Sequence, residues 1–404
     1  MSGSPELISV LDLGRQALTG VFPSNPAEAV TSGPLELVVC PDGGLLQLRQ
    51  TYDLWEMYGD NYGYRSGLNK AMVRHLQQKV TWLTERVPLQ RGDIVLDIGS
   101  NDATLLKSYP KVGQQFGGID PSAKKFEEYY PEDVRLTCDF FSAHAFRQMF
   151  GDSAKAKIVT SIAMFYDLED PLAFMREVES ILDNEGVWHF EQSYMPSMLK
   201  ATAYDTACHE HLEYYGLGQI KWMTDRAGLK ILDVSLNDVN GGSFAVTVAK
   251  QSSRRSANDG VVQALLDQEH SMAFETLKPY EDFRHSTFRH REALVGLVKR
   301  LNAEGKTVFG YGASTKGNVL LQFCGFTAAD IQCIAEVNED KFGHFTPGTG
   351  IPIVSEAEAR ARKPDYFMVL PWHFRSGIIA REREFLAGGG HLIFPLPKLE
   401  IVGD

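Results

Sequence analysis

Two stretches of this chain alternate between short apolar runs and helical patterns, and this alternation constrains the fold more than any other feature. In residues 92–200 the apolar runs are Ile94-Val-Leu-Asp-Ile98, Phe116-Gly-Gly-Ile119 and Ile158-Val-Thr-Ser-Ile162, and the helical patterns cover 122–130 and 171–182. Strands that alternate with helices predict a parallel, doubly wound sheet. A β-hairpin is expected at 229–249, around the turn Asn240-Gly-Gly, to complete this sheet.

The rest of the chain predicts two further units. After Gly305 a second alternation begins, with strands expected at 307–310, 331–335, 366–370 and 391–394. The start of the chain is rich in Gly and Pro with short strand patterns, whereas 68–87 and 259–301 are helical in pattern. A chain of 404 residues is also too long for one ordinary core. We therefore expect an α/β protein with a small N-terminal domain at 1–75, a doubly wound core at 76–255 and a second Rossmann-like domain at 256–404.

Composition and charge argue against several classes of partner. The net charge is −12 and the isoelectric point about 5.4, so the chain lacks the basic surface that a nucleic acid backbone demands. No run approaches the roughly 18 apolar residues of a membrane span, and the N-terminus lacks a signal-peptide pattern. The five cysteines include no CxxC pair, which is typical of reduced thiols. We expect a cytoplasmic protein, monomeric or weakly self-associating, that acts on a small molecule.

The strongest chemical signal in the central unit is the string Asp97-Ile-Gly-Ser-Asn-Asp102, which ends its first strand. An acid, a glycine turn and a following helix let the backbone approach a ligand closely. Asp120 ends the next strand about twenty residues later, the spacing of one βα unit, where it is placed to accept both ribose hydroxyls of an adenosine. A dinucleotide fingerprint requires GxGxxG, and here Gly99 is followed by Asn101 and Ala103 instead.

This looser loop favours S-adenosylmethionine, which has a methionine tail in place of a pyrophosphate. One strand further on, Asp139 and Phe140 supply an acid and an apolar ring for the adenine. We expect S-adenosylmethionine as the cofactor, with contacts from Asp97, Gly99, Asn101, Asp120, Asp139, Phe140 and Tyr166. The plain alternative is an ordinary strand-to-helix turn with a buried acid.

Eight strings along nearly the whole chain match, in order, those of one known family. They are Leu11-Asp-Leu-Gly14, Gly33-Pro-Leu-Glu-Leu37, Tyr62-Gly-Tyr-Arg-Ser-Gly67, Asp97-Ile-Gly-Ser-Asn-Asp102, His209-Glu-His-Leu212, Asn240-Gly-Gly-Ser243, Gly310-Tyr-Gly-Ala-Ser-Thr-Lys-Gly-Asn318 and Pro347-Gly-Thr-Gly-Ile-Pro352. With these strings the chain resembles the sugar C-methyltransferases of deoxysugar pathways, which act on nucleotide-activated 4-keto-sugars. The resemblance implies a class I methyltransferase core between two other modules.

The N-terminal domain departs from that family. Its members typically carry a small zinc domain with two cysteine pairs, and only Cys40 of the second pair stands here. Structural zinc needs four ligands, almost always Cys or His. We therefore expect this domain without zinc or another metal, held by packing against the methyltransferase core instead.

The resemblance gives the string His209-Glu-His211 the catalytic role. Carbon methylation beside a ketone needs a base for the α-proton, and neutral imidazole is plentiful at pH 7 because the ordinary pKa of histidine is about 6.5. The resemblance implies His211 as this base, with His209 in the same string and Glu210 contacting or orienting the sugar. Tyr62 and Tyr64 would close over the substrate and donate to its oxygens.

One position of this string differs from the family, because Cys208 stands where members carry a tyrosine. Tyr204, Tyr214 and Tyr215 are candidates to replace the missing phenol. Two simpler interpretations of the histidine pair stay open. Side chains at i and i+2 of a strand share a face and suit a metal, although no third ligand lies near in sequence, or both histidines are structural.

The second alternating unit carries its own ligand signal. The glycine-rich string at 310–317 follows a strand and precedes a helix, which suits an anion at a helix N-terminus. Dehydrogenase-type NAD binding is an open alternative for this string by itself, with Glu336 as the only acid placed to close the next strand. The resemblance assigns this half to the nucleotide sugar, with candidate contacts from Asn240, Ser314, Lys316, Trp372 and His373.

The leading hypothesis is an S-adenosylmethionine-dependent C-methyltransferase that acts on a nucleotide-linked keto-deoxysugar through an enolate, in natural product biosynthesis. An alternative keeps the methyltransferase but moves the methyl group to a hydroxyl or to another small acceptor. A third hypothesis is a non-catalytic binding protein, and the retention of Asp97, Asp120 and His211 together argues against it.

Overall fold

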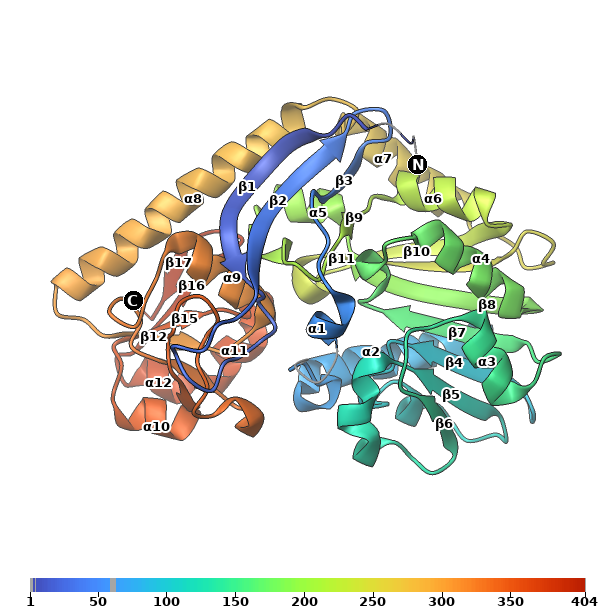
Figure 1. The fold of residues 1–404 in the computed structure, drawn as a ribbon, viewed down its shortest axis with the longest axis horizontal. Helices are drawn as coiled ribbons and strands as arrows, with labels where there is room; N and C mark the ends of the chain where they lie inside the picture. The colour runs from blue at the N-terminus through green and yellow to red at the C-terminus, as the bar shows by residue number, and fades with distance from the viewer. Residues whose placement is uncertain (1–2, 4, 59–62, 404) are drawn as a thin grey trace.

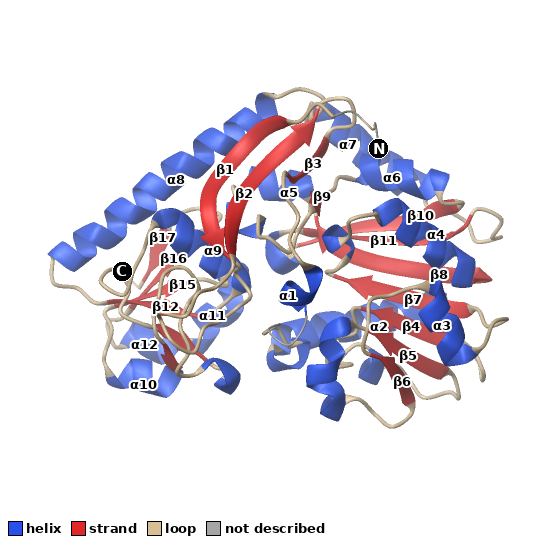
Figure 2. Ribbon diagram, in the orientation of Figure 1, coloured by secondary structure: helices blue, strands red, loops and turns tan. Residues whose placement is uncertain are grey.

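The computed structural model describes residues 3, 5–58 and 63–403. Figure 1 shows two α/β lobes joined at one end by an antiparallel sheet and a long helix. Helices lie on both faces of the sheet in each lobe (Figure 2). Among the described residues, no helix is both long and apolar enough to cross a membrane.

The central part of the chain forms a seven-stranded sheet in the order β10-β11-β8-β7-β4-β5-β6. Its strands are β4 (Ile94–Ile98), β5 (Gln115–Ile119), β6 (Val134–Thr137), β7 (Ala156–Ile162), β8 (Leu182–Ser193), β10 (Leu229–Asn237) and β11 (Ser243–Lys250). The strands from β4 to β8 pair in parallel, and β10 and β11 form an antiparallel hairpin at one edge. Every residue of β4 is buried, because helices cover both faces. The predicted doubly wound sheet and its closing hairpin are therefore confirmed.

The helices of this lobe are α2 (Lys70–Arg86), α3 (Ala143–Phe150), α4 (Pro171–Ile181), α5 (Met195–Lys200), α6 (Leu217–Arg226) and α7 (Asp259–Ser271). α2 begins where the Asn69 side chain accepts the amides of Ala71 and Met72. It buries one stripe of side chains, namely Met72, Leu76, Val80 and Leu83. Burial of each stabilises the fold by roughly 1.5–3 kcal/mol. The helical pattern expected at 122–130 is a 3-10 helix, η3 (Pro121–Tyr129).

The C-terminal lobe is a six-stranded sheet in the order β14-β13-β12-β15-β16-β17. Its elements are β12 (Val308–Tyr311), α9 (Thr315–Cys324), β13 (Ile334–Glu336), β14 (Ile353–Ser355), α10 (Glu356–Ala361), β15 (Tyr366–Val369), α11 (Arg375–Arg381), α12 (Arg383–Ala387), β16 (His391–Phe394) and β17 (Glu400–Val402). All pairs except β16 with β17 are parallel. Read from β17 to β14, the chain order reverses between β12 and β15, the place where ligands bind in such sheets. The expected second Rossmann-like unit is confirmed.

The N-terminal segment forms a four-stranded antiparallel sheet in the order β1-β2-β3-β9. Its strands are β1 (Ile8–Ala17), β2 (Ser32–Cys40), β3 (Leu45–Leu48) and β9 (Glu213–Tyr214), and α1 (Leu54–Tyr58) follows. The last strand comes from the central part of the chain, which no local pattern indicated. Buried residues of β1 and β2 share a core with α8 (Lys278–Ala303) and the C-terminal lobe. The same core includes Met195, Met198 and Tyr214 of the methyltransferase domain, and β3 pairs with β9 of that domain. The segment therefore packs on the methyltransferase domain as expected, and also on α8 and the C-terminal lobe.

Candidate active site

Backbone strain gathers at the carboxyl edge of the central sheet, where the chain order reverses between β4 and β7. Gly99, Asn101, Ala103 and Ala163 have φ of 74°, 49°, 59° and 56°, all in the left-handed region. A Cβ on Gly99 would lie 3.1 Å from the Cγ of Met164, a tight contact, and the positive φ also favours glycine there. Strain of this kind persists where the surrounding structure fixes it, and it clusters at functional sites.

Two buried carboxylates flank this edge. Asp97 accepts a hydrogen bond of 2.6 Å from the Thr160 hydroxyl, and burial, opposed by that bond and helped by the Asp120 charge, raises its pKa to about 7. Asp120 accepts from the Asn101 amide at 2.7 Å and from the amide of Ser122 at 2.7 Å. Burial also raises the pKa of Asp120. Neither carboxylate forms an ion pair with a Lys or Arg of the described chain.

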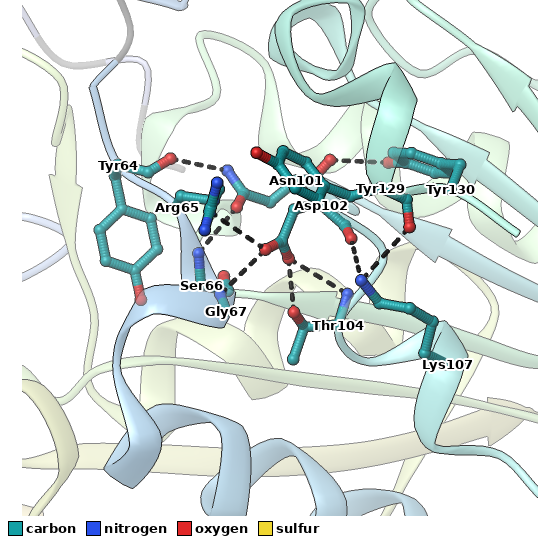
Figure 3. Close-up of polar contacts among 10 residues, drawn as sticks. All are labelled: Tyr64, Arg65, Ser66, Gly67, Asn101, Asp102, Thr104, Lys107, Tyr129 and Tyr130. Atoms are coloured by element: carbon teal, nitrogen blue, oxygen red, sulfur yellow. Dashed lines mark hydrogen bonds and ion pairs between the residues drawn. The ribbon is translucent and has the colours of Figure 1, made fainter. Parts of the chain in front are cut away.

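The loop after β4 is held by the segment that enters α2 (Figure 3). The Asn101 carbonyl oxygen Oδ1 accepts the Ser66 amide at 2.9 Å, and its Nδ2 donates to the Tyr64 carbonyl at 3.0 Å. Asp102 accepts the Gly67 amide at 3.0 Å. The Asn101 side chain, expected at the cofactor, therefore binds protein backbone here. The Tyr64 ring points away from these contacts (Figure 3) and is 42% exposed, while Tyr62 lies outside the described residues.

The segment after β6 presents an aromatic pair. Phe140 meets Trp55 of α1 edge-on, with ring centroids 4.9 Å apart, and the Trp55 side chain is 54% exposed. Asp139 is exposed and its Oδ1 accepts the Phe140 amide at 2.7 Å. Trp55 comes from the N-terminal segment, where sequence reasoning had no reason to seek a neighbour of Phe140.

His211 lies in the loop between η5 (Tyr204–Thr206) and β9. Its Nδ1 lies 2.8 Å from the Thr206 carbonyl oxygen, and its ring lies over the Tyr166 ring at 4.2 Å. Tyr166, expected at the cofactor, is thus in contact with the expected base. Burial, together with the Lys316 cation, lowers the pKa of His211 to about 3, so the ring is neutral at pH 7. Tyr214 donates to the same carbonyl at 3.4 Å, which makes it the candidate phenol beside His211.

The other members of this string contact different residues. His209 is buried with its ring edge-on to Tyr52 at 4.7 Å, and burial lowers its pKa to about 4. Glu210 is buried, accepts from the Thr19 hydroxyl at 3.1 Å, and has its pKa raised by burial. The Cys208 thiol is fully buried and its pKa lies well above the ordinary value, because burial opposes the thiolate. A buried neutral thiol is chemically inert.

The C-terminal lobe reaches the His211 loop through two side chains. Lys316, in the first turn of α9, donates to the Asn240 carbonyl at 2.7 Å and to the Thr206 hydroxyl at 3.3 Å. Trp372 donates from Nε1 to the buried Asp205 carboxylate at 2.7 Å. The expected contacts Asn240, Lys316 and Trp372 therefore meet next to His211. Sequence reasoning missed Asp205 and Thr206, although they stand only four and three residues before His209.

The remaining expected contacts of this lobe lie close by. Burial and the Lys316 cation lower the pKa of His373 to about 3. The Ser314 hydroxyl accepts the Gly317 amide at 3.0 Å and so caps α9.

Asp167 is a further buried carboxylate that the sequence did not single out. Burial, with the charges of nearby glutamates, raises its pKa well above the ordinary value. Asp167 directly follows Tyr166 and ends the short 3-10 helix η4 (Phe165–Asp167), and a lone acid at such a position gives no sequence signal.

Metal chemistry has no candidate centre in the described part of the chain, where no three His, Cys, Asp or Glu side chains gather suitably. Cys40 is buried at the end of β2, paired in register with Leu45. His209 and His211 contact separate sets of residues, which argues against the metal-pair interpretation.

Comparisons with known proteins bear on the whole chain. Three family models match it: a C-methyltransferase C-terminal domain over residues 238–397, a methyltransferase domain over 72–234 and a zinc binding domain over 1–58. The chain is 30% identical over 402 residues to C-methyltransferase NovU of Streptomyces niveus, covering 99% of this chain and 95% of that protein. The chain belongs to this C-methyltransferase family. It is an S-adenosylmethionine-dependent methyltransferase.

Two solved structures that are similar to this C-methyltransferase each cover a little under half of the chain. One is a complex between the Haloferax volcanii Trm112 methyltransferase activator and a methyltransferase, with 15% identity, 45% of this chain and 94% of that chain covered, and a TM-score of 0.36. Another is magnesium protoporphyrin IX methyltransferase of Synechocystis with bound SAH, with 14% identity, coverages of 45% and 88%, and a TM-score of 0.35. The class I methyltransferase fold of the central lobe rests on its strand order and on the family match over 72–234.

Proposed function

We propose that this enzyme methylates the carbon beside the ketone of a nucleotide-linked keto-deoxysugar, with His211 as the base. The observation that carries the proposal is the hydrogen bond between His211 Nδ1 and the Thr206 carbonyl. A carbonyl oxygen only accepts, so Nδ1 must hold the ring proton and Nε2 must carry the lone pair. The neutral ring therefore has an unprotonated Nε2 at pH 7, the state that a base needs in order to remove an α-proton.

The edge of the central sheet fits the cofactor. S-adenosylmethionine, when bound, supplies an electrophilic methyl group on a cationic sulfonium. Asp97 and Asp120 are buried without a protein cation, so a cationic ligand would favour their ionised forms. We assign Asp120 to the ribose, the strained backbone at Gly99 to close approach, and Phe140 with Trp55 to the adenine.

The C-terminal lobe fits the nucleotide part of the substrate. Its glycine-rich loop ends in the N-terminus of α9, and Glu336 accepts the Ala313 amide of that loop at 2.6 Å. Asp120 holds the Asn101 amide in the same way in the central lobe. This repeated arrangement of acid and loop supports a nucleotide at the C-terminal switch point.

The chain's own residues would move one proton. His211 Nε2 would take the α-proton, the C–H pair would form the C=C bond of the enolate, and the carbonyl π pair would move onto the ketone oxygen. The enolate carbon could then take the methyl group that bound S-adenosylmethionine supplies, with S-adenosylhomocysteine as the leaving group. Tyr214 and Thr206 keep the His211 ring in place, and the proton later leaves His211 for solvent. Glu210 lies too deep to replace His211 as base, and its bonds to Thr19 support an orienting role.

Hydrogen exchange separates this function from methylation of a hydroxyl. In D₂O, with S-adenosylhomocysteine in the cofactor site, the enzyme should exchange the α-proton of a nucleoside-diphosphate-linked 4-keto-deoxyhexose, followed by NMR. An O-methyltransferase has no need of this exchange. Methylation without exchange would replace the enolate mechanism with the hydroxyl alternative.

A further inference from the structure

The ammonium group of Lys316 lies beside His211, the proposed base. It does not lie over the glycine-rich loop to which Lys316 belongs. Its Nζ donates to the Asn240 carbonyl at 2.7 Å and to the Thr206 hydroxyl at 3.3 Å. Thr206 also holds His211 through its carbonyl oxygen at 2.8 Å. One residue therefore ties the base and the cation together, although they come from different lobes.

Asp205 is the counter-charge of this lysine. Its carboxylate is buried in η5, next to Thr206, and accepts the Trp372 indole N–H at 2.7 Å. Burial raises the pKa of Asp205, and the Lys316 cation opposes that shift. A Cβ on Gly241 would lie 3.0 Å from Trp372, so the indole is packed tightly over the Asn240 turn. Trp372 thus fixes the Asp205 carboxylate, whose charge attracts the Lys316 ammonium.

This placement has a chemical consequence for proton transfer. An imidazolium at His211 and an ammonium at Lys316 repel each other, which is part of why the His211 ring is neutral at pH 7. When the proton reaches His211, a negative oxyanion forms next to Lys316. This negative charge offsets the repulsion between the two positive side chains. The cation therefore stabilises the enolate more than the ketone, and only such differential stabilisation accelerates a reaction.

We propose that Lys316 is a catalytic residue that stabilises the enolate oxygen, and that Asp205 is the positioning residue that holds it there. This inference rests on the proposed function. In this step the α C–H bond breaks and its proton goes to His211 Nε2. The C–H electron pair forms the C=C bond of the enolate, and the carbonyl π pair moves onto the ketone oxygen beside the Lys316 ammonium. A lysine that served only as a phosphate ligand would instead affect substrate affinity.

The test measures α-proton exchange in D₂O with S-adenosylhomocysteine and a saturating nucleoside-diphosphate-linked 4-keto-deoxyhexose. Lys316→Met should slow exchange at saturation by about 10²-fold or more, as loss of an oxyanion donor does, with substrate Kd changed less than about threefold. Lys316→Gln removes the charge but keeps a polar side chain, and should still slow exchange by about tenfold or more. Asp205→Asn should lower the exchange rate at saturation with substrate Kd unchanged, because the Lys316 ammonium loses the negative charge that positions it.

Lys341 provides the matched control, because it is another lysine of the same lobe that donates to a backbone carbonyl, that of Ala313, at 2.8 Å. Lys341→Met should keep the saturated exchange rate within about threefold of wild type. The pH profile adds a second readout. Lys316 is the charged group that acts on His211, so Lys316→Gln should move the acid limb of the exchange rate to higher pH.

Four results would overturn the proposal. Unchanged exchange at saturation with a raised Kd in Lys316→Met would make the lysine a phosphate ligand. Equal losses in the Lys341 control, or circular dichroism showing that both Lys316 variants are unfolded, would make it structural. Absence of exchange in the wild-type enzyme itself would refute the proposed function, and this inference with it.

Discussion

Asn101→Ala should release the segment that covers the cofactor loop, rather than act on the cofactor directly. The Asn101 side chain makes two hydrogen bonds to this segment, at 2.9 Å to the Ser66 amide and at 3.0 Å to the Tyr64 carbonyl. At 0.5–1.5 kcal/mol each, their loss should lower the local opening free energy by about 1–3 kcal/mol. The population of the open segment should then rise roughly 5- to 150-fold.

Trypsin reports this opening, because Arg65 lies within the segment, close to Asp102 and over the Tyr129 ring. Cleavage after Arg65 should accelerate by the same factor, measured by mass spectrometry, while cleavage after Lys398 keeps its wild-type rate. Asn101→Gly is the matched variant. It loses the same bonds but relieves the φ of 49°, so it should melt at a higher temperature than Asn101→Ala. An unchanged cut at Arg65, combined with tenfold weaker cofactor binding, would refute this reasoning and return Asn101 to the cofactor.

Four other outcomes are expected. Asp120→Ala should weaken S-adenosylmethionine binding about tenfold or more in calorimetry, and unchanged affinity would place the ribose elsewhere. S-adenosylmethionine affinity should rise as pH increases through about 7, because Asp97 must ionise to meet a cation, and Asp97→Asn should flatten that profile. His211→Asn should lower turnover by about 10²–10⁴-fold with cofactor affinity retained, and a wild-type rate would exclude it as the base. Elemental analysis should find well under one zinc per chain, and a stoichiometric zinc that survives dialysis would contradict the expected loss of the metal.

The sequence by itself determined the two alternating units and most of their strands, because those strands are local and strongly patterned, but it did not indicate β8, β14 or β17. Buried parallel strands such as β4 read as continuous apolar runs, and the Asn240-Gly-Gly turn fixes the β10–β11 hairpin. The same logic located Asp97, Gly99 and Asp120, since the carboxyl ends of neighbouring parallel strands share one edge. The spacing of one βα unit was enough for that part of the site.

Only the tertiary structure decided which residues, distant in sequence, meet between the two lobes. β9 joins the N-terminal sheet from more than 160 residues away, through pairs such as Leu46 with Tyr214, and a two-residue strand has no periodicity to detect. The contact of Lys316 with Thr206 depends on how the lobes dock, as does that of Trp372 with Asp205. Docking is set by summed apolar packing of β1, β2 and α8 in one core, and no local pattern of the chain encodes that sum. The placement of the Lys316 cation beside His211 is therefore a property of the folded molecule, although the sequence pointed to both residues separately.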